Sequence, residues 1–272
     1  MRNIKPLLLT LIIASNVFSG EPDEKLHIQC LYPTVMIATN EGGCGTGTII
    51  RSDKISEKEY RNVVLTCSHV LSEDSRVLYR VYRGEYKNWS DLEKIIHYPA
   101  VVCDKNVKLD LSVLVFISSI KMNVAVLGTD VKSYIGNEIF KIGFGGEEYF
   151  RLDYGKITFF NVDRVAGSLS VESAVKINLT RHSALTLPGD SGGPVFQEYK
   201  LIGITNSVKI IRNPVDEESK MLLGHIGYFV PISALIEWNK SEKNLDFVFD
   251  STKELPKTDF ARLNLLEYQV TQ

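Results

Sequence analysis

Short runs of strand-forming residues recur along the chain from about residue 31, and they constrain its fold more than any other feature. The runs are rich in Val, Ile, Thr, Tyr and Phe, and turn-forming Gly, Asn, Asp and Ser residues separate them. They cover residues 33–39, 47–50, 63–67, 77–82, 111–117, 138–143, 175–179, 195–196, 201–205 and 227–232. Many short strands with frequent turns are typical of an all-β sandwich or barrel rather than of βαβ units.

Length and charge narrow the class of protein further. The 272 residues are enough to bury a substantial core, in one domain, in two, or in an all-β protein of two packed barrels. The formal net charge of −2, with 24% charged residues, gives no strong basic field for a nucleic acid and no disordered acidic tail. We therefore expect a globular protein whose partners are not nucleic acids.

The first twenty residues differ from the rest of the chain. A positive start is followed by an apolar run at residues 7–14, and the small residues Ser19 and Gly20 precede an acidic stretch. This order is typical of a secretory signal peptide, and the apolar run is short for a membrane span. We predict a signal peptide at residues 1–20, a secreted or periplasmic protein, and no membrane association after signal removal. An uncleaved N-terminal anchor is the alternative.

Two helix candidates lie late in the chain. Residues 233–239 follow a proline and begin with Ser233, a good capping residue. Residues 258–268 place apolar side chains at near-helical spacing, and the stretch between the two candidates is polar and highly charged. We therefore expect one functional unit at residues 21–240 and a C-terminal extension at residues 241–272.

The strongest chemical signal is the segment 188–194, which reads Pro-Gly-Asp-Ser-Gly-Gly-Pro. A serine hydroxyl is a poor nucleophile at its ordinary pKa, so it needs a neighbouring base and a site for the oxyanion that forms when it attacks a carbonyl. Glycines around Ser191 let backbone N–H groups turn toward one point. The segment predicts an activated Ser191, and the structural alternative is a glycine-rich turn without chemistry.

The same segment also fits Gly-x-Ser-x-Gly, the nucleophile turn of the α/β hydrolases. That fold needs a helix directly after the serine, and Gly192, Gly193 and Pro194 are poor residues for a helix interior. It also needs an acid and then a histidine downstream, where only Asp216 and His225 are available. The β-rich pattern therefore disfavours this alternative.

A base and an acid for Ser191 are expected upstream. Of the five histidines, His69 stands at the end of an apolar strand-like run, where a rigid strand can hold an imidazole in one orientation. Asp110 directly precedes the apolar run 111–115, and a carboxylate in such surroundings is costly unless it is paired. Asp104 competes with Asp110 but lacks the apolar flanks. We predict a catalytic triad of His69, Asp110 and Ser191.

Three segments resemble the signature segments of the chymotrypsin-like, or trypsin-like, serine peptidases. They are Thr66-Cys67-Ser68-His69, Asp110-Leu111-Ser112-Val113-Leu114 and Gly189-Asp190-Ser191-Gly192-Gly193-Pro194. The order His, Asp, Ser is that of this family, from which the roles of the three residues are taken. The resemblance extends over roughly residues 30–240, with weaker matches at 45–50, 201–205 and 227–238.

The resemblance implies two six-stranded antiparallel β-barrels, with an active site between them and a helix at the C-terminal end. Residues 21–240 would then be the protease domain. Protein or peptide substrates would be hydrolysed through an acyl-enzyme, with no cofactor and no metal ion. The backbone N–H groups of Gly189 and Ser191 would form the oxyanion hole.

The chain departs from the zymogen members of the family. In those members an Ile-Val-Gly-Gly segment becomes the N-terminus, and its ammonium pairs with the aspartate before the serine. This chain has no such segment, so Asp190 has no assigned partner. The chain is more similar to bacterial members that fold active, such as the protease domain of HtrA-like proteins and secreted glutamyl endopeptidases. We expect signal removal to be sufficient for maturation.

The primary specificity pocket of the family corresponds to Leu185, Thr186, Thr205 and Gly227 in this sequence. Leu185 stands at the base of the pocket, where an aspartate would select Lys or Arg, so an apolar or small substrate side chain is expected. Thr205 takes the place of the histidine of glutamate-specific relatives, which argues against glutamate specificity. Gly227 leaves room in the pocket wall.

Four cysteines follow the signal sequence, and an even count in an exported chain favours disulfides. No Cys-x-x-Cys pattern is present, so a structural zinc site is not expected. Four cysteines allow three pairings. By the resemblance, Cys44 and Cys67 fall on neighbouring strands, which makes Cys44–Cys67 the expected disulfide and leaves Cys30 with Cys103.

The sequence therefore predicts an exported serine endopeptidase. The alternative is a catalytically silent protease homologue that binds a protein partner through the same cleft. Such relatives usually lack a member of the triad, and here all three candidates are present.

Overall fold

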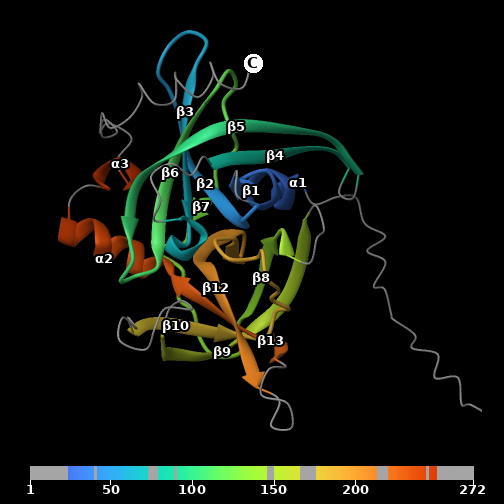
Figure 1. The fold of residues 1–272 in the computed structure, drawn as a ribbon, viewed down its shortest axis with the longest axis vertical. Coiled ribbons are helices and arrows are strands. Elements are labelled where there is room, and N and C mark those ends of the chain that lie inside the picture. Colours follow the sequence, from blue (N-terminus) through green and yellow to red (C-terminus); the bar gives the residue numbers. More distant parts are fainter. Residues whose placement is uncertain are drawn as a thin grey trace, which may run out of the picture.

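Two antiparallel β-barrels of six strands each, followed by a helix near the C-terminal end, make up the fold, and this confirms the predicted all-β class. The computed structural model describes residues 24–39, 42–72, 79–88, 91–145, 150–165, 176–212, 220–242 and 245–249. Figure 1 shows the first barrel above the second. The chain completes one barrel before it begins the next, so each barrel is one continuous stretch of sequence.

The first barrel closes in the order β1-β2-β3-β6-β5-β4. Its strands are β1 (Thr34–Thr39), β2 (Cys44–Lys54), β3 (Tyr60–Thr66), β4 (Tyr79–Asn88), β5 (Asp91–Asn106) and β6 (Leu111–Ser118). Successive side chains of a strand point to opposite faces of a sheet. On β3, Val64 therefore packs inside the barrel, while Val63 and Leu65 pack into a second core outside it.

The second barrel closes in the order β11-β8-β9-β10-β13-β12, with β11 also pairing β12. Its strands are β8 (Glu138–Gly143), β9 (Arg151–Val165), β10 (Lys176–His182), β11 (Pro194–Gln197), β12 (Lys200–Arg212) and β13 (Lys220–Pro231). The short β7 (Val126–Leu127) adds to β12 in parallel. Ile139, Ile157, Val195 and Phe229 are among the apolar residues of its interior cluster.

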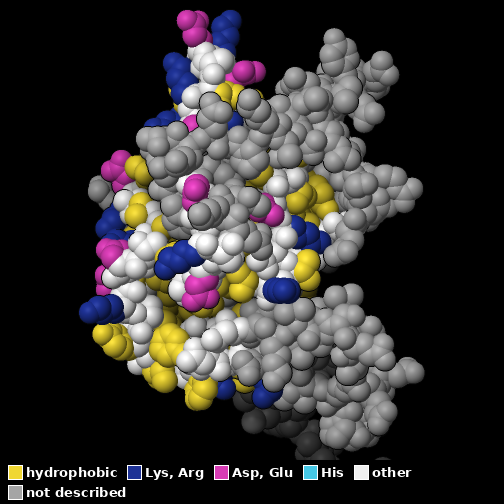
Figure 2. Space-filling model, turned by 90° about the vertical axis from the view of Figure 1, so that its left-hand side faces the viewer, with side chains coloured by type: hydrophobic (Ala, Val, Ile, Leu, Met, Phe, Trp, Pro, Cys, Tyr) yellow, Lys and Arg dark blue, Asp and Glu magenta, His cyan; other side chains and the backbone are white. Residues whose placement is uncertain are grey.

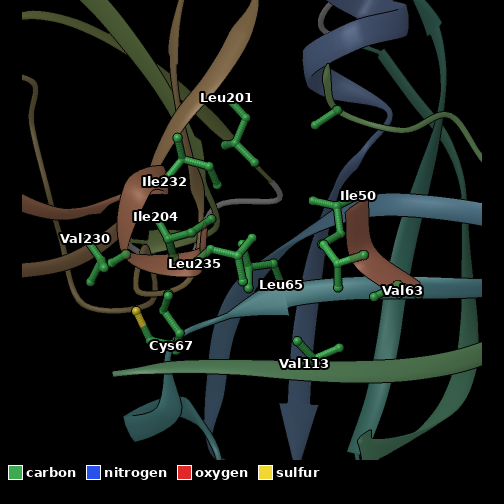
Figure 3. Close-up of a cluster of buried hydrophobic side chains, with 14 of the residues drawn as sticks. Ile50, Val63, Leu65, Cys67, Val113, Leu201, Ile204, Val230, Ile232 and Leu235 are labelled. Carbon is green, nitrogen blue, oxygen red and sulfur yellow. The ribbon is translucent and has the colours of Figure 1, made fainter. Parts of the chain in front are cut away.

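A large apolar cluster joins the two barrels. Leu65 and Val113 of the first barrel, Ile204 of the second and Leu235 of the last long helix are all buried in it (Figure 3). The elements outside the barrels are α1 (Glu24–Leu26), the π-helical turn η1 (His27–Leu31), the 3-10 turn η2 (Ser68–Val70), α2 (Ile232–Glu242) and α3 (Asp246–Phe249). This shared core holds the barrels in one relative position, which fixes the geometry of any site at their junction.

Every predicted strand run overlaps an observed strand, and the run 138–143 coincides with β8. The sequence pattern does not predict β5, β7 or β9. The predicted helix at 233–239 lies within α2, but α2 begins at Ile232, so Ser233 is in its first turn rather than at its cap. The predicted signal peptide at 1–20 and the predicted helix at 258–268 lie outside the described residues.

The described surface mixes charges of both signs. On the face in Figure 2, Lys and Arg side chains alternate with Asp and Glu side chains rather than forming one patch. Within the described residues, no helix is long and apolar enough to span a bilayer.

Candidate active site

His69 and Asp110 meet at one end of the first barrel. His69 lies in η2 directly after β3, and Asp110 ends the turn before β6. Because β3 and β6 are paired neighbours, with Thr66 opposite Ser112, the two turns lie side by side. Asp110 Oδ2 is 2.6 Å from His69 Nδ1, and Asp110 Oδ1 accepts the His69 backbone N–H at 2.9 Å. A carboxylate at that distance requires a proton on Nδ1, which leaves Nε2 as a proton acceptor.

The backbone around Asp110 places its carboxylate. Asp110 is 2% exposed and has a φ of 51°, in the left-handed region that aspartate tolerates better than most residues. Its carbonyl accepts the N–H of Ser68 at 3.2 Å, which ties the two turns together. Asp104, the competing candidate, lies on β5 and accepts the N–H of Lys105. The structure thus pairs Asp110, not Asp104, with His69.

Asn206 and Cys67 complete the surroundings of Asp110. Asn206 donates its side-chain amide to Asp110 Oδ2 at 2.5 Å, so the buried carboxylate receives three N–H donors in total. Cys67 is fully buried, and its thiol donates to the carbonyl of Thr205 at 3.1 Å. Burial, and next the negative charge of Asp110, raises the pKa of the Cys67 thiol well above its usual value. The thiol therefore stays protonated. Both carboxylate oxygens of Asp110 have hydrogen-bond donors, as a buried carboxylate requires.

Ser191 joins the same network through Asn206. The Ser191 hydroxyl donates to the backbone carbonyl of Asn206 at 3.1 Å, while the side chain of this asparagine holds Asp110. Within the described part of the chain, Ser191 Oγ has no hydrogen bond to His69. The structure therefore brings the three predicted residues into one network, in which the bond between serine and histidine is not formed.

Positive φ angles shape the turn that carries Ser191. Gly189 has a φ of 97° and Gly192 a φ of 87°, values that side chains rarely adopt. A Cβ on Gly189 would also lie 2.9 Å from the carbonyl of Phe144. The backbone N–H groups of Gly189 and Ser191 bond to no residue that the structure describes. Both predicted oxyanion donors are thus unoccupied by the protein.

Thr46 fastens this turn to the first barrel. Its N–H donates to the carbonyl of Ser191 at 2.8 Å, and its hydroxyl donates to the carbonyl of Gly189 at 2.8 Å. The Thr46 hydroxyl also accepts the N–H of Phe144 at 3.1 Å, and the Thr46 carbonyl accepts the hydroxyl of Thr66 at 2.8 Å. The nucleophile candidate of one barrel is therefore held against the histidine and aspartate of the other.

A comparison of the sequence with known protein families agrees with this arrangement of His69, Asp110 and Ser191. The profile of the trypsin-like peptidase domain matches residues 45–204, a span that contains His69, Asp110 and Ser191. The chain belongs to the trypsin-like peptidase family. A search of curated proteins found no match.

Several solved structures share the trypsin-like fold of this chain. Deg5 matches with a TM-score of 0.55 at 17% identity, over 79% of this chain and 90% of its own. The HtrA-type protease AlgW with a tripeptide matches with a TM-score of 0.57 at 18% identity, over 80% of this chain and 62% of its own. A serine endoprotease from Yersinia pestis matches with a TM-score of 0.53 at 17% identity, over 80% of this chain and 65% of its own. The predicted similarity to bacterial HtrA-like members is confirmed at the level of the fold.

In this trypsin-like domain, two internal cations pair with Asp190, the aspartate before the serine. The fully buried Lys141 on β8 donates to Asp190 Oδ2 at 2.6 Å, and Arg151 donates to the same oxygen at 2.7 Å. The N–H groups of Gly145 and Leu187 also bond to the Asp190 carboxylate, at 2.9 and 2.8 Å. Burial lowers the pKa of Lys141, and the charge of Asp190 opposes this shift. Asp190, next to Ser191 in sequence, is thus anchored from within the second barrel.

Replacing Lys141 with methionine should lower the free energy of unfolding by about 3–5 kcal/mol, because it removes one partner of a buried ion pair. The matched control is Lys156→Met on the adjacent strand β9. Lys156 is 60% exposed and only 4.0 Å from Glu138, a surface pair worth at most about 1 kcal/mol. Urea unfolding of both variants measures the difference. Equal losses would show that the Lys141–Asp190 pair does not anchor the turn.

The predicted pocket residues lie together around β13. Thr186 donates its N–H to the carbonyl of Gly224 at 2.8 Å, and Gly227 is the cross-strand partner of His182. The partly exposed Leu185 packs toward Gly224, since its Cδ1 is 2.6 Å from where a Cβ on Gly224 would lie. Thr205 is buried on β12, opposite Phe229 of β13.

The predicted disulfides are wrong. All four cysteines, Cys30, Cys44, Cys67 and Cys103, are thiols in the structure. Cys44 and Cys67 do lie on or next to the paired strands β2 and β3, but Cys44 is exposed while Cys67 is buried with its sulfur directed at Thr205 of the second barrel. Strand neighbours form a disulfide only when their Cβ atoms face each other.

Cys67, His69 and Asp110 also form the one group of three potential metal ligands among the described residues, with ligand atoms within 4.8 Å of one another. Hydrogen bonds explain the arrangement, since both Asp110 oxygens accept N–H groups and the thiol donates to Thr205. The raised pKa of Cys67 also disfavours the thiolate that a metal ion requires. We assign no metal-binding role to the group.

Sequence reasoning missed Asn206 and Lys141. Asn206 carries no signal of its own, because it links Asp110 to Ser191 only through contacts between distant segments. Lys141 does carry one: it is a lone cation in the apolar run 138–143. A buried charge in an apolar strand needs a partner, and this holds for Lys141 as it does for Asp110.

Proposed function

We propose that the protein is a serine endopeptidase that hydrolyses peptide bonds through an acyl-enzyme intermediate. The observation that carries this proposal is the double role of Asn206. Its side chain holds Asp110, which in turn fixes His69, and its backbone carbonyl holds the Ser191 hydroxyl. One residue thus places the base and the nucleophile of the proposed reaction within one hydrogen-bonded unit. Membership of the trypsin-like family supports protein or peptide substrates.

In the proposed acylation step, the Ser191 hydroxyl turns from Asn206 toward His69 Nε2. Ser191 Oγ attacks the carbonyl carbon of the scissile peptide bond, and its proton passes to Nε2. The Nδ1–H bond to Asp110 stabilises the imidazolium that forms. The carbonyl oxygen becomes an oxyanion, for which the N–H groups of Gly189 and Ser191 are available.

Collapse of the tetrahedral intermediate breaks the C–N bond, and His69 gives its proton to the leaving amine. A water molecule then attacks the acyl-serine while His69 Nε2 accepts its proton. The second collapse releases the carboxylic acid and returns the proton to Ser191 Oγ. No cofactor takes part in this sequence, and every proton is carried by His69.

The internal anchoring of Asp190 supports maturation without a zymogen cut. In the zymogen members described above, a newly formed ammonium holds the corresponding aspartate. Here the ammonium of Lys141 and the guanidinium of Arg151 are part of the chain before any cleavage. We propose that removal of residues 1–20 on export, to a secreted or periplasmic location, is the only processing that activity requires.

One observation favours the second candidate function, a silent homologue that binds a protein partner. The Ser191 hydroxyl is bonded to Asn206 rather than to His69, so the nucleophile is not yet activated. In unliganded proteases, catalytic hydrogen bonds are often long or misaligned and tighten only with substrate. The endopeptidase is therefore the stronger proposal, and the reactivity of Ser191 separates the two.

Treatment of the purified protein with a serine-reactive phosphonate tests the proposal. We expect one covalent adduct per chain, located on Ser191 by peptide mass spectrometry, and no adduct on the Ser191→Ala protein. The remaining serines act as internal controls, because a hydroxyl without a base does not react. A folded protein that takes up no phosphonate would favour the partner-binding homologue.

A further inference from the structure

Three buried polar atoms without hydrogen-bond partners lie in and beside the predicted pocket. They are Nδ1 and Nε2 of His182 and Oγ1 of Thr205, and neither residue has any exposed surface. A buried polar group without a partner costs about 1–3 kcal/mol. Most such groups in folded proteins are paired, so an unpaired set in one place can take up the polar atoms of a bound group.

Strand register puts these atoms on one face of the sheet. β13 lies between β10 and β12 in the second barrel. His182 of β10 is opposite Gly227, and Thr205 of β12 is opposite Phe229. Cross-strand partners share a face, and so do residues two apart on one strand. His182 and Thr205 therefore face the same interior, and the rings of His182 and Phe229 are 5.9 Å apart.

Because Gly227 has no side chain, two polar groups pack closely beside it. A Cβ on Gly227 would lie 2.7 Å from His182 Nε2, and it would clash with His182 Cε1 and with Thr186 Oγ1. The imidazole and the Thr186 hydroxyl thus share the space beside Gly227 that a side chain would fill. The Thr186 hydroxyl donates to the carbonyl of Ala184 at 3.2 Å, and its oxygen can still accept a hydrogen bond. Thr186 lies five residues before Ser191 in the sequence.

Charges around the space are already balanced. The nearby cluster contains two cations, Lys141 and Arg151, and two anions, Asp153 and Asp190, joined by contacts of 2.6 to 3.7 Å. Burial, together with the charge of Lys141, lowers the pKa of His182 to about 3. The imidazole is therefore neutral at ordinary pH, and it offers one N–H donor and one nitrogen acceptor.

These properties discriminate between side chains that precede a scissile bond. A carboxylate or an ammonium would be buried without an opposite charge, which is costly. An apolar side chain would leave the three polar atoms unpaired. A primary amide can pair with two of them, because its oxygen accepts the imidazole N–H while its NH2 group donates to a threonine hydroxyl. The longer glutamine reaches a fully buried partner more readily than asparagine.

We propose that His182, with Thr186 and Thr205, selects substrates with a side-chain amide, above all glutamine, before the scissile bond. This specificity rests on the proposed endopeptidase activity and revises the apolar preference expected from Leu185. His182 has no exposed surface in the unliganded structure. The pocket therefore widens as the substrate side chain enters, and the hydrogen bonds gained offset the cost of opening.

Two measurements test the proposal. The cleavage sites in a denatured protein mixture are read by mass spectrometry, and kcat/KM is measured on peptides that differ only in Gln, Glu, Leu or Lys before the scissile bond. We expect cleavage after glutamine, at least about tenfold faster than after leucine. The variants His182→Phe and Thr205→Val should each lower kcat/KM for the glutamine peptide by about ten- to a hundredfold.

The matched control is Thr48→Val on β2, which removes another buried and unpaired threonine hydroxyl from the first barrel. It should leave the order of the four peptides unchanged. Thr205→Val keeps the shape of the side chain, so it carries the test if His182→Phe does not fold. A protein that forms the Ser191 phosphonate adduct but prefers Leu, Glu or Lys would overturn the specificity alone. A protein without adduct or cleavage would overturn the endopeptidase and the specificity together.

Discussion

Replacement of Ser191 by alanine should lower kcat on a peptide substrate by about a million-fold, because the nucleophile and its base act as one unit. The double variant Ser191→Ala with His69→Ala should then show almost no further loss. A residual rate above that in water is expected, because the oxyanion donors belong to the backbone of Gly189 and Ser191 and survive the substitution.

The measurement is single-turnover hydrolysis of a peptide substrate by each variant at equal protein concentration. Ser133→Ala is the matched control, since the Ser133 hydroxyl bonds to Gln197 at 2.9 Å on the second barrel, outside the proposed machinery. It should retain activity within about twofold, because Ser133 bonds none of the residues of the proposed triad. Full activity in Ser191→Ala would overturn the proposed mechanism.

Replacement of Asp110 by asparagine should lower kcat by about ten-thousand-fold, the loss typical of a triad whose histidine is held in the wrong tautomer. The contacts explain the size of this effect. Asp110 Oδ2 accepts both His69 Nδ1–H and the amide of Asn206, and Oδ1 accepts the His69 backbone N–H. An asparagine has one oxygen for these three donors. Its NH2 group would face a donor in either orientation, and His69 would lose its fixed Nδ1–H.

Asp104→Asn is the matched control, because Asp104 is the other acid near the end of β5 and does not contact His69. It should leave kcat unchanged within a few-fold. Thermal unfolding of both variants separates loss of the tautomer from loss of the fold. Equal activity losses in folded Asp110→Asn and Asp104→Asn would remove Asp110 from the proposed triad.

The sequence predicted the parts of the site that depend on local signals. The Gly-rich segment around Ser191 and the charge of Asp110 before an apolar strand each carry their own physical reason, and the structure connects both to one network. Asn206 and His182 could not be found in this way. Each acts through partners on other strands. The register between distant strands cannot be predicted from the residues that flank Asn206 or His182 in the sequence.

The sequence pattern predicted the fold class but missed individual strands that are partly exposed. β5 and β9 are the longest strands of their barrels, and each mixes charged and apolar residues because part of each faces solvent. On β9, Tyr154 and Phe159 are more than half exposed although both are aromatic. Patterns of apolar residues predict buried strands well and long, partly exposed strands poorly. The disulfide prediction failed for a related reason, since neighbouring strands do not fix which way a sulfur points.

The continuous course of each barrel has a consequence during synthesis. Translation up to about residue 120 delivers all six strands of the first barrel, together with His69 and Asp110. Ser191 and Asn206 leave the ribosome later, on the second barrel. Under the proposed function, a partly made chain holds a folded base and acid without a nucleophile, and cannot hydrolyse its neighbours. Apart from removal of residues 1–20, completion of the second barrel would then be the event that starts the protease.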